Sequence, residues 1–254
     1  MSSVHDPSPS SSSKVPMSVN DLPEHLKAQY REDAKENLVN VQDSFYRISI
    51  KGGRYKVNDS IIGDRGLEFN AIILREIPVN IWYRDPYNPA SPVGPDCWSL
   101  GGLKPDLSSA EVQSESCLGC KLNRFGSGKG ADGKRRGKAC KNTRRLVLKV
   151  EKIDLPVVIT LPPTSTKALN FYLKLLSSGD VPIPVFGVET IFSLDTTVEY
   201  PKPIMQQGRF LSVDRYKEIK EYRNSAPVED ALKAYATPDD AEGPEGPEDE
   251  EVPF

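Results

Sequence analysis

The chain has 254 residues and a net charge of −3, and only 37% of its residues are hydrophobic. This length suffices for one sizeable domain with appendages, or for two small domains, with a real apolar core. No stretch approaches the ~18 apolar residues of a membrane span and the first residues lack a signal pattern, so we expect a cytoplasmic protein without a membrane partner.

The first forty residues predict an arm followed by a helix. Residues 1–20 are rich in Ser and Pro, a composition typical of disorder. Within 21–40, Asp21 suits a helix N-cap, Pro23 suits the first turn, and apolar residues recur at four-residue steps. We therefore expect a helix over 22–38.

Residues 41–212 predict a body built mainly of strands. The segments 43–51 and 54–58 alternate apolar and polar residues on either side of Gly52-Gly53, which indicates a hairpin. Further strands are predicted at 67–75, 79–84, 144–150, 156–161 and 186–200. The outward positions of the hairpin and of 79–84 combine cations with aromatic rings: Phe45, Arg47, Lys51, Arg54, Lys56, Trp82 and Arg84.

Two helical regions complete the predicted body. One runs from Thr164 to about Ser177, and the other covers 213–236 with a break at Pro227. Several short strands with a helix part-way along predict a mainly β (α+β) fold, an oligonucleotide-binding-like barrel with peripheral helices. An antiparallel sandwich is the alternative.

All four cysteines fall in one polar insertion at 85–143. They are Cys97, Cys117, Cys120 and Cys140, with nineteen residues on each side of the Cys-Leu-Gly-Cys knuckle. Four thiolates match the ligand count of structural zinc, and the insertion is too polar and Gly-rich to fold on apolar burial alone. We expect one structural zinc ion per chain, with disulfides, free thiols and an iron–sulfur cluster as alternatives.

Charge is distributed unevenly along the chain. Residues 121–145 hold ten Lys or Arg side chains against the single acid Asp132. Residues 237–254 hold eight acids and no base, so without them the net charge changes from −3 to +5. A basic body with an acidic, disordered tail suits a protein that binds a polyanion. The alternative is a solvent-exposed basic loop without a binding function.

No catalytic motif is found, so no catalytic residue is assigned and we expect a protein that is not an enzyme. The Gly-rich stretch around Gly128-Lys129 lacks the spacing of a phosphate loop. The two histidines, His5 and His25, lie in or near the N-terminal arm, away from any other candidate for acid–base chemistry. A metal-dependent nuclease built on carboxylates is the alternative.

Single-stranded nucleic acid requires cations for its phosphates and aromatic faces for its bases. The outward residues of the predicted strands supply both. Further candidates come from the insertion and the strand after it: Trp98, Lys134, Arg135, Arg136, Lys138, Arg144 and Arg145. A zinc-containing transcription or RNA-binding regulator is the runner-up, because stacking and phosphate contacts serve DNA and RNA alike.

The chain closes on "DEEVPF", which resembles the acidic tip of bacterial single-stranded DNA-binding proteins. The matching positions are Asp249, Glu250, Glu251, Val252, Pro253 and Phe254. In that family the tip docks replication and repair proteins, with the last aromatic residue and its carboxylate in a basic-rimmed apolar pocket. Here Glu stands where Asp is usual and Val where Ile is usual.

The body also resembles proteins encoded in the replication modules of tailed phages. The similar stretches are "DPYNP", "GPDCWSLGG", "CLGC", "GKACKNTRRL" and "LPPTS". This resemblance implies a phage-encoded single-stranded DNA-binding protein of replication, recombination or repair, located in the host cytoplasm. It implies that residues 41–200 bind the DNA and that the tip binds host proteins. It does not fix the oligomeric state, and a homo-oligomer is one alternative.

Overall fold

The computed structural model describes residues 22–33, 45–85, 94–129, 137–198, 200 and 202–234. It divides into two units, residues 1–42 and residues 43–254. The first unit contains helix α1 (Glu24–Asp33), which lies within the predicted helix. Asp21 and residues 34–38 of that prediction fall outside the described ranges. The second unit is the body.

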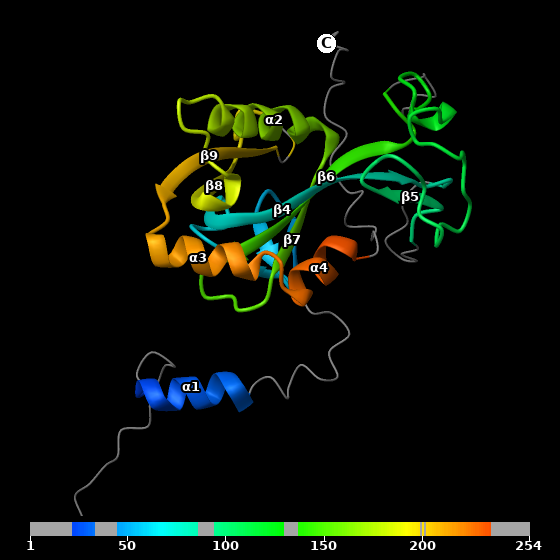
Figure 1. Ribbon diagram of the computed structural model, residues 1–254. Coiled ribbons are helices and arrows are strands. Elements are labelled where there is room, and N and C mark those ends of the chain that lie inside the picture. Colours follow the sequence, from blue (N-terminus) through cyan, green and yellow to red (C-terminus); the bar gives the residue numbers. More distant parts are fainter. Residues whose placement is uncertain are drawn as a thin grey trace, which may run out of the picture. The chain divides into compact units, whose positions relative to one another are not determined.

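The body contains a nine-stranded, strongly curled sheet with helices on both faces (Figure 1). The strands lie in the order β3-β2-β1-β7-β6-β4-β8-β9, and β5 pairs with the far end of β4. Among these pairs only β1 and β7 run parallel. The strands are β1 (Tyr46–Ile50), β2 (Tyr55–Val57), β3 (Ser60–Ile61), β4 (Glu68–Trp82), β5 (Cys97–Leu100), β6 (Lys141–Val150), β7 (Val157–Leu161), β8 (Val188–Leu194) and β9 (Pro203–Phe210).

Two apolar cores lie on opposite faces of this sheet. On one face the strands pack with Leu169 and Tyr172 of α2 (Pro163–Ser177). On the other face they pack with residues of α3 (Val213–Tyr222) and α4 (Ala226–Lys233), such as Ile219 and Val228. Neighbouring residues of β6 and β7 enter different cores, because side chains alternate along a strand. This explains why the paired segments 146–148 of β6 and 157–159 of β7 are continuously apolar.

The predicted hairpin is confirmed, and its turn depends on glycine. Ile48 pairs with Val57 and Ile50 pairs with Tyr55 across β1 and β2. Gly52 and Gly53 both have positive φ, +62° and +66°, which is the conformation that a two-residue hairpin turn matched to strand twist requires.

The predicted strands at 67–75 and 79–84 form the single long strand β4. Its pairing with β6 shifts between Ile73 and Arg75, which marks a bulge at Leu74. The Leu74 carbonyl accepts a hydrogen bond from Arg223 Nε (3.2 Å) beside α3. Pro78 fits in this strand because its carbonyl accepts from the Gly101 N–H (2.8 Å), so its nitrogen lies away from the β6 ladder.

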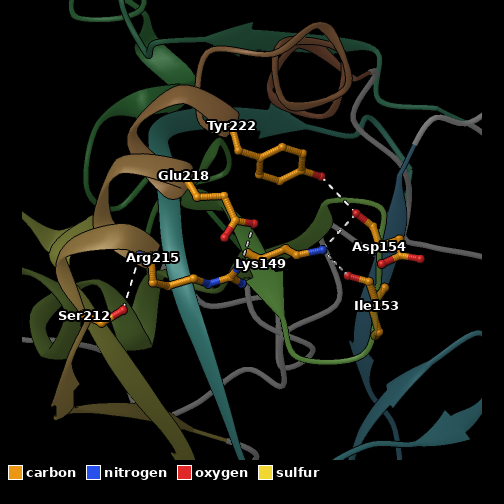
Figure 2. A network of polar contacts seen from close by, with 7 residues as sticks. All are labelled: Lys149, Ile153, Asp154, Ser212, Arg215, Glu218 and Tyr222. Atoms are coloured by element: carbon orange, nitrogen blue, oxygen red, sulfur yellow. Dashed lines mark hydrogen bonds and ion pairs between the residues drawn. The ribbon is translucent and has the colours of Figure 1, made fainter. Parts of the chain in front are cut away.

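The loop between β6 and β7 is held against α3 by the polar network of Figure 2. Lys149 Nζ donates to the carbonyl oxygens of Ile153 (2.6 Å) and Asp154 (3.0 Å), and Tyr222 Oη donates to the Asp154 carbonyl (3.1 Å). Partial burial lowers the pKa of Lys149 and raises the pKa of Tyr222 to about 12. Ser212 caps α3 by accepting from the Arg215 N–H (3.3 Å).

Most predicted elements appear, and strands β3, β5 and β9 are additional. Strand β3 has only two residues, both exposed. The break in the C-terminal helices lies at residues 223–225, and Pro227 occupies the first turn of α4. Strand β9 was not predicted, since only Pro203 and Met205 of its residues are buried. Strand β5 was not predicted because it lies inside the insertion. Among the helices of the described ranges, none is long and apolar enough to span a membrane.

Candidate functional site

The insertion forms a module at one end of the sheet, beside β4, β5 and β6 (Figure 1). We call the described residues 97–129 and 137–140 the cysteine module. Cys97 begins β5 and pairs with Trp82, the last residue of β4. Cys140 directly precedes Lys141, which begins β6 and pairs with Ile81. The two outer cysteines therefore flank the same end of β4, one strand away on either side.

All four cysteines line one small cavity. Its other lining residues include Asn80, Trp98, Ser99 and Asn123. The cavity volume open to the centre of a water molecule is about 20 Å³. This volume is on the scale of a single water molecule or ion. The knuckle is fixed by hydrogen bonds from the Cys117 N–H to the Leu103 carbonyl (2.9 Å) and from Asn123 Nδ2 to the Cys117 carbonyl (2.8 Å).

The thiols interact electrostatically with one another. Burial, with smaller contributions from the other three thiols, raises the pKa of Cys140 to about 12. Burial also raises the pKa of Cys97, and Cys117 and Cys120 add to this rise. All four are free cysteines. The fold therefore gathers the residues that the sequence singled out.

The gathering falls short of a coordination shell. Within the described ranges, no three His, Cys, Asp or Glu side chains are arranged to hold a metal ion as they stand. All four cysteines nevertheless line the same cavity. Small rotations of cysteine side chains would change the sulfur positions without moving the backbone.

The module and the first residue of β6 also form a loop of cations, four of them exposed and one, Lys141, half-buried. Residues 121–129 and 137–141 lie together, because the Gly126 N–H donates to the Gly137 carbonyl (2.6 Å) and the Cys140 N–H to the Leu122 carbonyl (2.9 Å). We call these two segments the basic loop. They contain no acid, and their cations are Lys121, Arg124, Lys129, Lys138 and Lys141.

Two aromatic residues predicted to stack on bases are buried instead. Phe45 is 8% exposed and packs in the core beneath α3 and α4, so the face of β1 that was expected to be open is covered by helices. Trp98 is 4% exposed and packs with Val79 and Ile81. Neither ring is available to a nucleic acid, and both predictions are wrong in this respect.

Arg145 is also withdrawn from the surface. Its side chain is fully buried, and Nη1 donates to the carbonyl oxygens of Leu232 (3.1 Å) and Ala234 (2.5 Å) at the end of α4. A cation at a helix C-terminus satisfies carbonyls that have no partner within the helix. The expectation that Arg145 contacts DNA is therefore wrong, since its role is to dock α4 on the sheet.

Two further arginines are engaged in ion pairs. Arg144 is half-buried. Its Nη1 lies 3.4 Å from Glu76 Oε2, and its Nη2 donates to Asn170 Oδ1 (3.1 Å). Arg84 is exposed and forms an ion pair with Glu111, which ties the end of β4 to the module. Both arginine side chains remain partly accessible to solvent, but their conformations are fixed by ion pairs within the protein.

The remaining candidates separate into two groups. On the hairpin, Lys51 and Arg54 are exposed and Lys56 is half-buried. The guanidinium carbon of Arg47 lies 5.1 Å from the centre of the Phe45 ring. Half-buried Trp82 lies at the module end of β4. Strands β7 and β6 separate β1 from β4, so the structure does not bring the hairpin cations and Trp82 into one surface.

Some predicted site residues fall outside the described ranges. They are Lys134, Arg135 and Arg136 in the insertion and Asp249, Glu250, Glu251, Val252, Pro253 and Phe254 in the tip. Lys138 is described and exposed, on the basic loop.

One aromatic ring that the sequence analysis passed over lies on the basic loop. Phe125 is 46% exposed and directly follows Arg124. Its neighbours in "NRFGSGK" are polar or glycine, so alternation along a strand gives no signal for it. An aromatic residue without apolar neighbours in a Gly-rich basic segment was the available clue.

Comparison with protein-family models, with curated proteins and with solved structures found no match to this chain.

Proposed function

We propose that the protein binds single-stranded DNA and acts as a binding protein rather than as an enzyme. One observation supports the proposal: the two segments of the basic loop contain four exposed cations, the half-buried Lys141 and no acid, on a module that adjoins one end of the sheet. Single strands bind to such surfaces because cations neutralise phosphates while flexible bases remain free to stack. We assign the curled sheet as a variant of the oligonucleotide-binding barrel.

Structural zinc is part of this proposal. The donor set fits, since four thiols line a cavity on the scale of one ion. A disulfide between Cys97 and Cys140 fits poorly, because two strand spacings, roughly 10 Å, exceed the reach of such a bond. Bound zinc would supply a cross-link among the four cysteines. The chain's own residues would then hold the basic loop against β4 and β6.

The acidic tip completes the proposal. Residues 249–254 resemble a docking tip, which suits recruitment of replication, recombination or repair proteins to coated DNA. The eight acids of residues 237–254, three of them in the tip, would also be attracted to the basic loop when DNA is absent. By the resemblance of the body, we assign the protein to a phage replication system acting in the host cytoplasm.

The proposal is tested by the salt dependence of oligo-dT binding to the intact protein. Single-strand affinity falls with a slope of about −0.7 per neutralised phosphate in a plot of log K against log salt. Replacing Lys121→Gln together with Lys138→Gln should make the slope shallower by about 1.4. The control pair, Lys217→Gln with Lys220→Gln on α3, should leave it unchanged. Equal slopes for both pairs would contradict the assignment of the basic loop.

A further inference from the structure

Phe125 is an exposed aromatic ring on the basic loop, and its neighbours in sequence are polar residues and glycines. Tyr55, Phe69, Tyr172 and Phe192 lie in the cores of the body, whereas Phe125, Phe171 and Phe210 are exposed. Of these three exposed rings, Phe125 lies on the basic loop, and an aromatic ring among cations is the combination that binds single-stranded nucleic acid.

The backbone holds Phe125 in a defined position. Ser127 Oγ donates to the Leu122 carbonyl (2.8 Å) and accepts from the Ala139 N–H (2.9 Å), which closes the loop on both sides of the ring. Gly126, the next residue, has a φ of +80°, and a Cβ placed there would meet no atom within 4 Å. The ring, which is 46% exposed, therefore lies on a loop fixed by its own hydrogen bonds.

The charge around this loop suits one class of ligand. Arg124 precedes the ring, Lys121 is one turn earlier, and the hydrogen bond between Gly126 and Gly137 brings Lys138 alongside. Phosphates would meet these cations while a base meets the ring. Duplex DNA would satisfy the cations but not the ring, because its bases are already stacked.

We infer that Phe125 is a base-stacking residue, and that the basic loop selects single strands over duplexes through this ring. The inference rests on the proposed function and adds to it the side chain that contacts the bases. The sequence-based assignment placed stacking on Phe45, Trp82 and Trp98 instead. Phe45 and Trp98 are buried, and Trp82 is half-buried.

The test compares Phe125→Ala and Phe125→Trp in the full chain, with Phe171→Ala as the control. Phe171 is 71% exposed on α2, a helix that also carries lysines and no acid. The probes are oligo-dT and an abasic oligonucleotide of equal length. Stacking is worth ~1 to 3 kcal/mol per base, so Phe125→Ala should weaken oligo-dT binding by about 5- to 150-fold.

Three further results are expected. Phe125→Ala should bind the abasic probe like the wild type, Phe171→Ala should bind oligo-dT like the wild type, and Phe125→Trp should keep its affinity and add a fluorescence signal that oligo-dT quenches. If wild type binds oligo-dT and Phe125→Ala binds it equally well, or if only Phe171→Ala weakens it, the stacking role is wrong while the proposed function stands. If wild type does not bind oligo-dT, the proposed function itself fails.

Discussion

Arg145 shows how a single residue changes meaning between sequence and structure. In the sequence it belongs to a run of cations and is indistinguishable from Arg144. In the structure it is fully buried and hydrogen-bonded to the last carbonyls of α4. Burial of a cation costs several kcal/mol unless hydrogen bonds compensate, so its carbonyl partners are essential to it.

Arg145→Met is therefore expected to destabilise the body without acting on DNA contacts. The substitution keeps much of the volume but leaves the carbonyls of Leu232 and Ala234 without their donor, so we expect a loss of about 2 to 4 kcal/mol in the free energy of unfolding. Urea unfolding measures this change. Arg144→Met is the matched control, and we expect it to cost less than about 1 kcal/mol, as partly exposed ion pairs do. An equal, small cost for both would contradict the docking role of Arg145.

Phe45 and Trp98 make the complementary point about apolar residues. Alternation correctly placed Phe45 on the sheet face opposite Ile48, since the two residues lie in different cores. It did not reveal that α3 and α4 cover that face, because helix packing depends on residues nearly two hundred positions later in the chain. Alternation predicts which face a side chain is on, and the covering elements determine whether that face is open.

At the scale of elements, the strands with strong patterns were predictable. The hairpin at Gly52-Gly53, strand β7 and helix α2 follow from local turn, alternation and stripe signals. Strand β9 was missed because it is largely polar, and the continuity of β4 was missed because Pro78 suggested an end. Local signals fail where a strand is stabilised mainly by hydrogen bonds to its neighbours.

The cysteine module is the element whose stability depends least on apolar burial. Its main apolar contacts are those of Trp98 with Val79 and Ile81. Both large cores lie on the rest of the sheet and contain no residue of the module. The module and the rest of the body should therefore unfold separately.

Removal of metal by a strong chelator should unfold the module and leave the body folded. We expect new protease cleavage between Cys97 and Cys140 and a change in Trp98 fluorescence, with little change in far-ultraviolet circular dichroism. Cys120→Ser should reproduce these effects, and Ser116→Ala, next to Cys117, should not. Purified protein without metal that resists cleavage in the module would contradict a structural ion.

At the scale of the whole molecule, the charges are sorted along the chain. The basic loop lies on a module at one end of the sheet, and the acids of residues 237–254 lie far from it in sequence. Such sorting suits a protein that holds a polyanion at one place and presents an acidic peptide to partners at another. The position of the module was not predictable, because pairing between β4 and β5 fixes it.

The measurement that tests the central claim most directly is a competition experiment on the intact protein. Labelled oligo-dT is bound first, and unlabelled oligo-dT, oligo-rU and duplex DNA of equal length are added at matched phosphate concentration and fixed salt. The account predicts that oligo-dT displaces the label at a concentration at least about tenfold below that of duplex DNA, because only unstacked bases reach Phe125. Displacement by oligo-rU at a lower concentration than oligo-dT would point to the RNA-binding alternative. Equal displacement by duplex DNA would contradict single-strand binding.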